Sequence, residues 1–425
     1  MRRVFKIVLL LLLVVLLAAV AAAAALLKPT YTLPPEGKAA IDARMAEYRK
    51  IADRVLLEMR RRPPEDAQAF EALVKELGPA TEEEKKSPPV RNTCPAYDQQ
   101  TLASGQPHMQ TLLKWEERIR AIVDDGLVLR KPDGYWEENL RSTLRFMYVF
   151  QWNEDLAVLS LQQGRNEEAV RRLLTGLRVA EGYYQTTFPH GGVSLENQTG
   201  LAIIHLLPRL APADLDRLKT ALQGLPDPRE QALKVDIVEL AEMLNTAEHL
   251  PRLMRELNDE DAATPAAAEA LSWQEDFDHW LAGRQAERSG ASGVKSSPTL
   301  IDRFIERQWY ILQSIRLREV DSDRAWLAAG GDGEYHAYND PEDWERVVFP
   351  PFQLVMMSKA FRLGPSVKTW QQRQSLLRAI DAELKRRADG GSSFELPYDS
   401  KSHIVVNAEY GCVVANERNQ PARSQ

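Results

Sequence analysis

Tryptophans closely followed by carboxylates are the residues here whose types and spacing could support chemistry. Enzymes that cleave glycosidic bonds hold two carboxylates about 5–10 Å apart as acid and base, and a Trp ring offers a flat apolar face for a sugar. Three such clusters form a candidate glycan site, which predicts a glycan-active hydrolase with an α/α helical body. Its residues are Trp136, Glu137, Glu138, Trp152, Glu154, Asp155, Trp273, Glu275 and Asp276.

A structural interpretation of the same clusters competes with the catalytic one. A Trp can anchor a helix to the core while the acids beside it favour the positive N-terminal end of that helix. Trp136 fits this pattern because it follows the turn sequence Pro132-Asp133-Gly134, and the spacing of the clusters is irregular. We therefore predict no catalytic residue and keep the hydrolase as the alternative.

Metal and cofactor chemistry finds no support in the motifs. The histidines are scattered, no two lie four apart, and neither a P-loop nor a dinucleotide fingerprint occurs. The acidic stretch Gly330–Glu345 could hold Ca²⁺ through Asp332, Glu334 and Asp340, but it lacks the ligand spacing of a helix-loop-helix calcium loop. We predict an exposed connector that ends in a helix N-cap at Asp340, and no cofactor or metal.

The two cysteines, Cys94 and Cys412, leave two alternatives open. In an oxidising compartment they could form one disulfide, and otherwise they are two thiols, with Cys412 a small strand residue. Sequence alone does not decide pairing.

The N-terminal segment predicts the compartment. Residues 1–6 carry three cations, and residues 7–27 form an unbroken apolar run that would cover about 30 Å as a helix, enough to cross a bilayer. The length favours a retained anchor with a cytoplasmic n-region, and the Ala-rich end leaves signal cleavage open. Either way, the spacer 28–36 and all that follows are expected in the periplasm or outside the cell.

Charge and composition limit the partners. The chain has a formal net charge of −7, with 44% hydrophobic and 27% charged residues, which is ordinary for a globular protein. An acidic balance argues against a nucleic-acid partner. The membrane is expected to be contacted through residues 7–27 only.

Helical periodicity dominates the remainder, so the expected fold is all-α: a multi-helix bundle or a short irregular solenoid of αα-hairpins. We expect a helical body at 37–258, linkers with one helix at 259–298, a second helical block at 299–389 and a β-hairpin at 392–417. Within that tail, 403–407 and 412–415 are the expected strands and 396–399 a turn. The segment 156–181 resembles one tetratricopeptide-type hairpin turning at Gly164, without a second copy.

One expected helix, Val193–Leu207, mixes a strongly apolar pattern with four polar residues. A polar edge facing solvent is the expected arrangement, with a small buried polar pocket as the alternative. The residues concerned are Glu196, Asn197, Thr199 and His205.

The ends and general layout, namely an anchor, an all-α body and the tail "FELPYDSKSHIVVNAEYGCVVA", resemble those of uncharacterised bacterial envelope proteins. The resemblance implies an envelope location and carries over no functional residue. With an acidic body and no catalytic set, we expect a non-enzymatic envelope scaffold or protein-interaction module with protein partners in the envelope.

Overall fold

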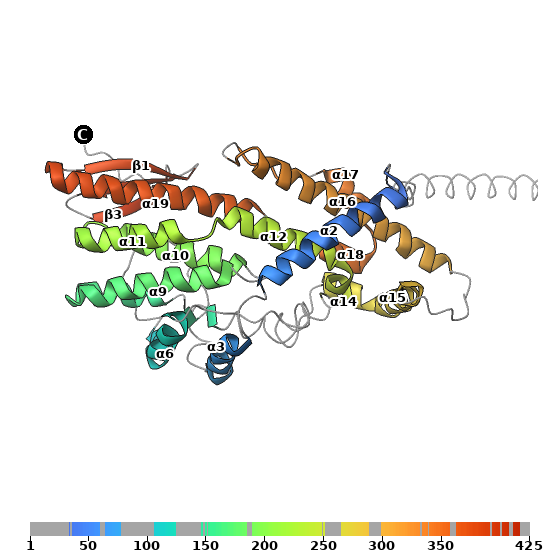
Figure 1. Ribbon diagram of the computed structural model, residues 1–425, viewed down its shortest axis with the longest axis horizontal. Coiled ribbons are helices and arrows are strands. Elements are labelled where there is room, and N and C mark those ends of the chain that lie inside the picture. Colours follow the sequence, from blue (N-terminus) through green and yellow to red (C-terminus); the bar gives the residue numbers. More distant parts are fainter. Residues whose placement is uncertain are drawn as a thin grey trace, which may run out of the picture. The chain divides into compact units, whose positions relative to one another are not determined.

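The computed structural model describes residues 34, 36–59, 64–77, 106–124, 146–147, 149–150, 152–184, 189–248, 250, 265–288, 299–331, 334–338, 340–357, 363–391, 393–399, 402–407 and 411–416. In this part the protein is mostly helical, with a small antiparallel sheet near its C-terminal end (Figure 1). The described helices include none that is both long and apolar enough to cross a bilayer. The predicted anchor at 7–27 lies outside the described residues, so it stays a prediction.

The chain divides into two compact units, each built from segments that are distant in sequence. Unit 1 is Met1–Ile51, Ile237–Ala325 and His336–Ala360, and unit 2 is Ala52–Asp236, Trp326–Tyr335 and Phe361–Gln425. Three of the five divisions fall inside helices: α2 (Gly37–Met59), α12 (Pro228–Ala241) and α16 (Leu300–Ala328). Periodicity marks helices but does not tell which of them pack together, so these units could not be read from the sequence blocks.

Unit 2 is built around an αα-hairpin, as the sequence predicts. Helix α8 (Asn153–Gln162) ends at a turn in which Gly164 has φ +75°, and α9 (Asn166–Tyr184) follows. A positive φ suits glycine because it has no Cβ. The hairpin packs on α10, and its apolar faces form continuous cores with the other helices of the unit. Those helices are α3 (Pro64–Leu77), α6 (Gln106–Asp124), α10 (Pro189–Leu206), α11 (Pro212–Gly224) and α19 (Leu363–Asp389).

The C-terminal tail forms three strands where the sequence predicts two. The strands β1 (Ser393–Asp399), β2 (Ser402–Asn407) and β3 (Gly411–Asn416) pair antiparallel in the order β1-β2-β3. The β2–β3 hairpin is confirmed, but the turn predicted at 396–399 is wrong because these residues belong to β1. Pro397 is tolerated there because β1 is an edge strand, and the register shifts between Pro397 and Asp399. Strand β1 packs on α19 and β3 on α10.

Unit 1 has an aromatic core. Phe277 and Trp280 of α15 (Gln274–Arg288) pack against Trp309 of α16 and Phe352 of α18 (Pro350–Met357). The short helix α17 (Pro341–Arg346) begins after Asp340, whose side chain accepts a hydrogen bond from the Glu342 N–H, so the predicted N-cap is confirmed.

The linkers predicted in the middle of the chain are partly helical. Within the predicted range 259–298, helix α14 (Pro265–Ser272) covers an Ala-rich stretch, and α15 continues through Arg288. Alanine has the highest helix propensity and proline is favoured in the first turn, so "PAAAEA" starts a helix although its composition resembles a linker. The structure thus has two helices where the sequence predicts one.

Candidate functional site

The residues of the candidate glycan site are divided between the two units. Trp152, Glu154 and Asp155 open α8 in unit 2 and are all buried, with Trp152 stacked on His108. Trp273 of unit 1 packs edge-on against Phe349, with Glu275 exposed and Asp276 half-buried. Trp136, Glu137 and Glu138 lie outside the described residues.

The local geometry of the α8 cluster matches the structural interpretation. Trp152 is the N-cap residue of α8 and is 1% exposed, while Glu154 and Asp155 stand in the first turn. Glu154 accepts a 2.7 Å hydrogen bond from the Thr199 hydroxyl on α10. A buried Trp cannot stack on a sugar in solution, so this cluster anchors α8 in the core, and the hydrolase stays an untested alternative.

The structure does not decide between the two alternatives for the cysteines. Cys412 lies on β3, opposite Val406 of β2, while Cys94 is outside the described residues, so both alternatives stay open. In the described ranges, three or more His, Cys, Asp and Glu side chains nowhere gather in a way that could hold a metal ion.

Buried charges in unit 2 pair with one another across helices. Arg172 of α9 donates to both carboxylate oxygens of Glu116 on α6, at 2.7 and 2.9 Å, and to Ser160 of α8. Arg120 binds Glu116 and Glu168, which joins α6 to the start of α9. Bidentate Arg–carboxylate pairs fix geometry as well as charge, so this network sets how α6, α8 and α9 meet.

A second buried pair joins two helices that are far apart in sequence. Arg373 of α19 binds both carboxylate oxygens of Glu196 on α10, at 2.6 and 2.7 Å, and also donates to the Leu225 carbonyl. The Tyr184 hydroxyl donates to Glu196 at 2.6 Å, and burial, reinforced by the Glu196 charge, raises the pKa of Tyr184 well above its usual value. The solvent-facing edge predicted for α10 is therefore wrong at Glu196 and Thr199, which are 3% and 0% exposed.

Acid should weaken unit 2 through Glu116. Burial acts to raise the pKa of Glu116, but hydrogen bonding and charge from Arg172, with Arg120 and Arg171, outweigh it and leave the pKa below the usual value of 4.5. A carboxyl whose pKa is lower in the folded than in the unfolded protein stabilises the fold. This contribution is complete above the pKa of the unfolded state and is lost as the pH falls through the pKa of the folded state.

We therefore expect the unfolding free energy of unit 2 to fall as pH drops below about 4.5. Glu116→Gln should be less stable at neutral pH and should show a flatter acid limb in urea titrations at stepped pH. Glu167→Gln is the matched control, because Glu167 is exposed. An acid limb that is identical in the wild type and Glu116→Gln would contradict this prediction.

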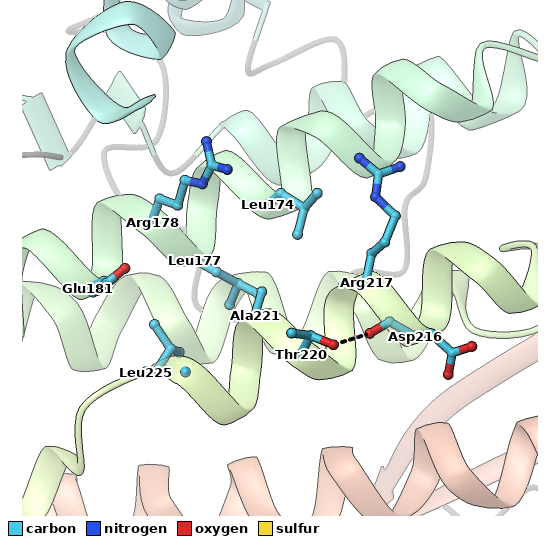
Figure 2. A pocket seen from close by; sticks show the side chains of 10 residues that line it. Leu174, Leu177, Arg178, Glu181, Asp216, Arg217, Thr220, Ala221 and Leu225 are labelled. Carbon is cyan, nitrogen blue, oxygen red and sulfur yellow. Dashed lines mark hydrogen bonds between the residues drawn. The ribbon is translucent and has the colours of Figure 1, made fainter. Parts of the chain in front are cut away.

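An open groove of about 610 Å³ lies between α9 and α11 of unit 2 (Figure 2). Its floor is apolar and its rim is charged. Leu174 and Leu177 follow helical spacing, which predicts one apolar face, but Leu174 is only half-buried and borders the open space of the groove. The groove is lined by Leu174, Leu177, Arg178, Glu181, Asp216, Arg217, Thr220, Ala221, Gly224 and Leu225.

Comparisons with protein-family models, with curated proteins and with solved structures find no match to this chain. The groove and the buried charge network therefore have to be interpreted from their own geometry, and the resemblance to bacterial envelope proteins stays a prediction.

Proposed function

We propose that this chain is a protein-interaction module, held in the envelope by residues 7–27 and facing outside the cytoplasm, which binds a protein partner in the groove between α9 and α11. The observation that carries the proposal is this groove: an apolar floor bordered by charged side chains and open to solvent. Arg172 on α9 and the Leu225 carbonyl at the end of α11 are each held by a buried arginine contact. Small apolar clefts with polar rims are typical of recognition sites.

The buried acids of unit 2 support a structural role for its charges. Glu154 binds Thr199, Glu196 binds Arg373, and Glu383 binds Arg386 and Arg387. Arg387 in turn donates to the carbonyls of Leu207 and Leu210, beyond the end of α10. These contacts hold α8, α10 and α19 together, and α9 and α11 pack on these helices, as expected for a rigid binding scaffold rather than for acids held ready for proton transfer.

Gly224 offers a way to close the groove without disturbing the fold. A Cβ built at Gly224 meets no heavy atom within 4 Å. A large side chain there would project into the groove, while a methyl group would leave it open. Gly224→Trp and Gly224→Ala are therefore a blocking variant and its matched control.

Capture from detergent-solubilised membranes tests the proposal. Tagged full-length chain should co-purify an envelope protein, and Gly224→Trp should reduce the recovered amount on the order of tenfold, as for the loss of a central interface contact. Gly224→Ala should retain it, as measured by quantitative mass spectrometry. Equal recovery with all three chains, or none above a tag-only control, would reject the groove as the binding site.

A further inference from the structure

The residues that line the groove lie on one face of each of two neighbouring helices. Leu174, Leu177 and Arg178 lie on one face of α9, and Arg217, Ala221 and Gly224 lie on one face of α11. Positions i, i+3, i+4 and i+7 share a helix face, and two such faces side by side form a seat for the apolar stripe of another helix. The small side chains at Ala221 and Gly224 let a helix approach closely.

Charge on the rim selects among such helices. Figure 2 shows the guanidinium groups of Arg178 and Arg217 on one side of the groove with Leu174 between them, while the Asp216 carboxylate points to the other side and Glu181 lies at one end, next to Arg178. The side chain of Arg217 is 54% exposed and pairs with Asp214 at 3.4 Å. An exposed pair of that length contributes little, so Arg217 can exchange Asp214 for a carboxylate on a partner at small cost.

We propose that the groove binds an amphipathic α-helix of a partner protein that carries acidic residues along one edge of its apolar stripe. This inference rests on the proposed function and adds the chemistry of the partner. The apolar stripe lies over Leu174 and Ala221, and the acidic edge faces Arg217. Reversing the charge on the groove or on the partner helix should weaken binding, because the apolar contact would then bring like charges together.

Fluorescence anisotropy with two designed probes tests the inference on the full-length chain in nanodiscs. Each probe is a labelled helical peptide of about 18 residues, five turns, with leucines at i, i+3, i+4 and i+7. One probe has glutamates along one edge of this stripe, and the other has lysines at the same positions. Empty nanodiscs report binding to lipid.

The acidic probe should bind the wild type about tenfold more tightly than the basic probe. Both Gly224→Trp and Arg217→Glu should weaken it by about tenfold. Gly224→Ala and Arg209→Glu should leave it unchanged, the latter because Arg209 is exposed and does not line the groove.

Failure of the acidic probe to bind, binding unaffected by Gly224→Trp, or equal binding of the basic probe would each overturn the inference. The proposed function fails separately, when membrane capture does not depend on Gly224. If capture depends on Gly224 but the acidic probe does not bind, the groove is a binding site and the chemistry assigned to its partner is wrong.

Discussion

Arg373→Met is expected to destabilise unit 2 by about 3–5 kcal/mol, the usual cost of removing one member of a buried ion pair. The side chains of Glu196 and Arg373 are 3% and 5% exposed, so the remaining carboxylate would be buried with the Tyr184 hydroxyl as its hydrogen-bond donor. Native-state hydrogen exchange should show the loss as faster exchange in α10 and α19, whereas α18 of unit 1 should be unaffected.

The double variant Glu196→Gln/Arg373→Met shows whether the loss of stability comes from the unpaired charge or from lost packing. Glutamine is neutral and can still accept the Tyr184 hydrogen bond, so the double variant should recover most of the stability that Arg373→Met loses. Replacing both members of a buried pair is often close to neutral. A double variant as unstable as the single one would show that the pair does not act as described.

Gly176→Ala is expected to destabilise unit 2 by about 1–3 kcal/mol, although alanine is the better helix former. A Cβ at Gly176 would lie 2.5 Å from the Thr199 Oγ1 and 3.3 Å from the Glu154 Oε1. Thr199 is fully buried and donates to Glu154, so it cannot turn away without losing that bond. The methyl group must therefore push α9 and α10 apart.

Gly283→Ala is the matched control for this substitution. A Cβ at Gly283 in α15 meets no heavy atom within 4 Å, so only helix propensity changes, and stability should rise by up to about 1 kcal/mol. In urea unfolding followed by circular dichroism, the free energy of unfolding should fall for Gly176→Ala and rise for Gly283→Ala. If both are stabilised, α9 and α10 do not approach as closely as described.

The sequence predicted helices well and their partners poorly. The α8–α9 hairpin with its turn at Gly164 and the N-cap at Asp340 follow from local rules of spacing and capping. The burial of Glu196 does not follow from such local rules, because its partner Arg373 lies 177 residues away. No local pattern distinguishes a polar residue at a solvent edge from one that meets a distant arginine.

The groove escaped prediction for a related reason. Leu174 and Leu177 repeat at helical spacing, which predicts an apolar face but does not say whether another helix covers it. Ala221 and Gly224 are small residues, and nothing in the sequence around them predicts a binding site. Only the packing of α11 beside α9 turns these residues into the floor and wall of one cleft.

The proposed function requires that the groove faces outside the cytoplasm and that residues 7–27 hold the chain in the membrane. Thr220 is exposed inside the groove, so Thr220→Cys in a Cys94→Ser/Cys412→Ser chain reports its location to a membrane-impermeant maleimide. Intact spheroplasts should be labelled, the labelled chain should remain in the membrane pellet after alkaline extraction, and the parent chain without Thr220→Cys should stay unlabelled. Labelling that appears only after lysis would place the groove in the cytoplasm and contradict the proposed function.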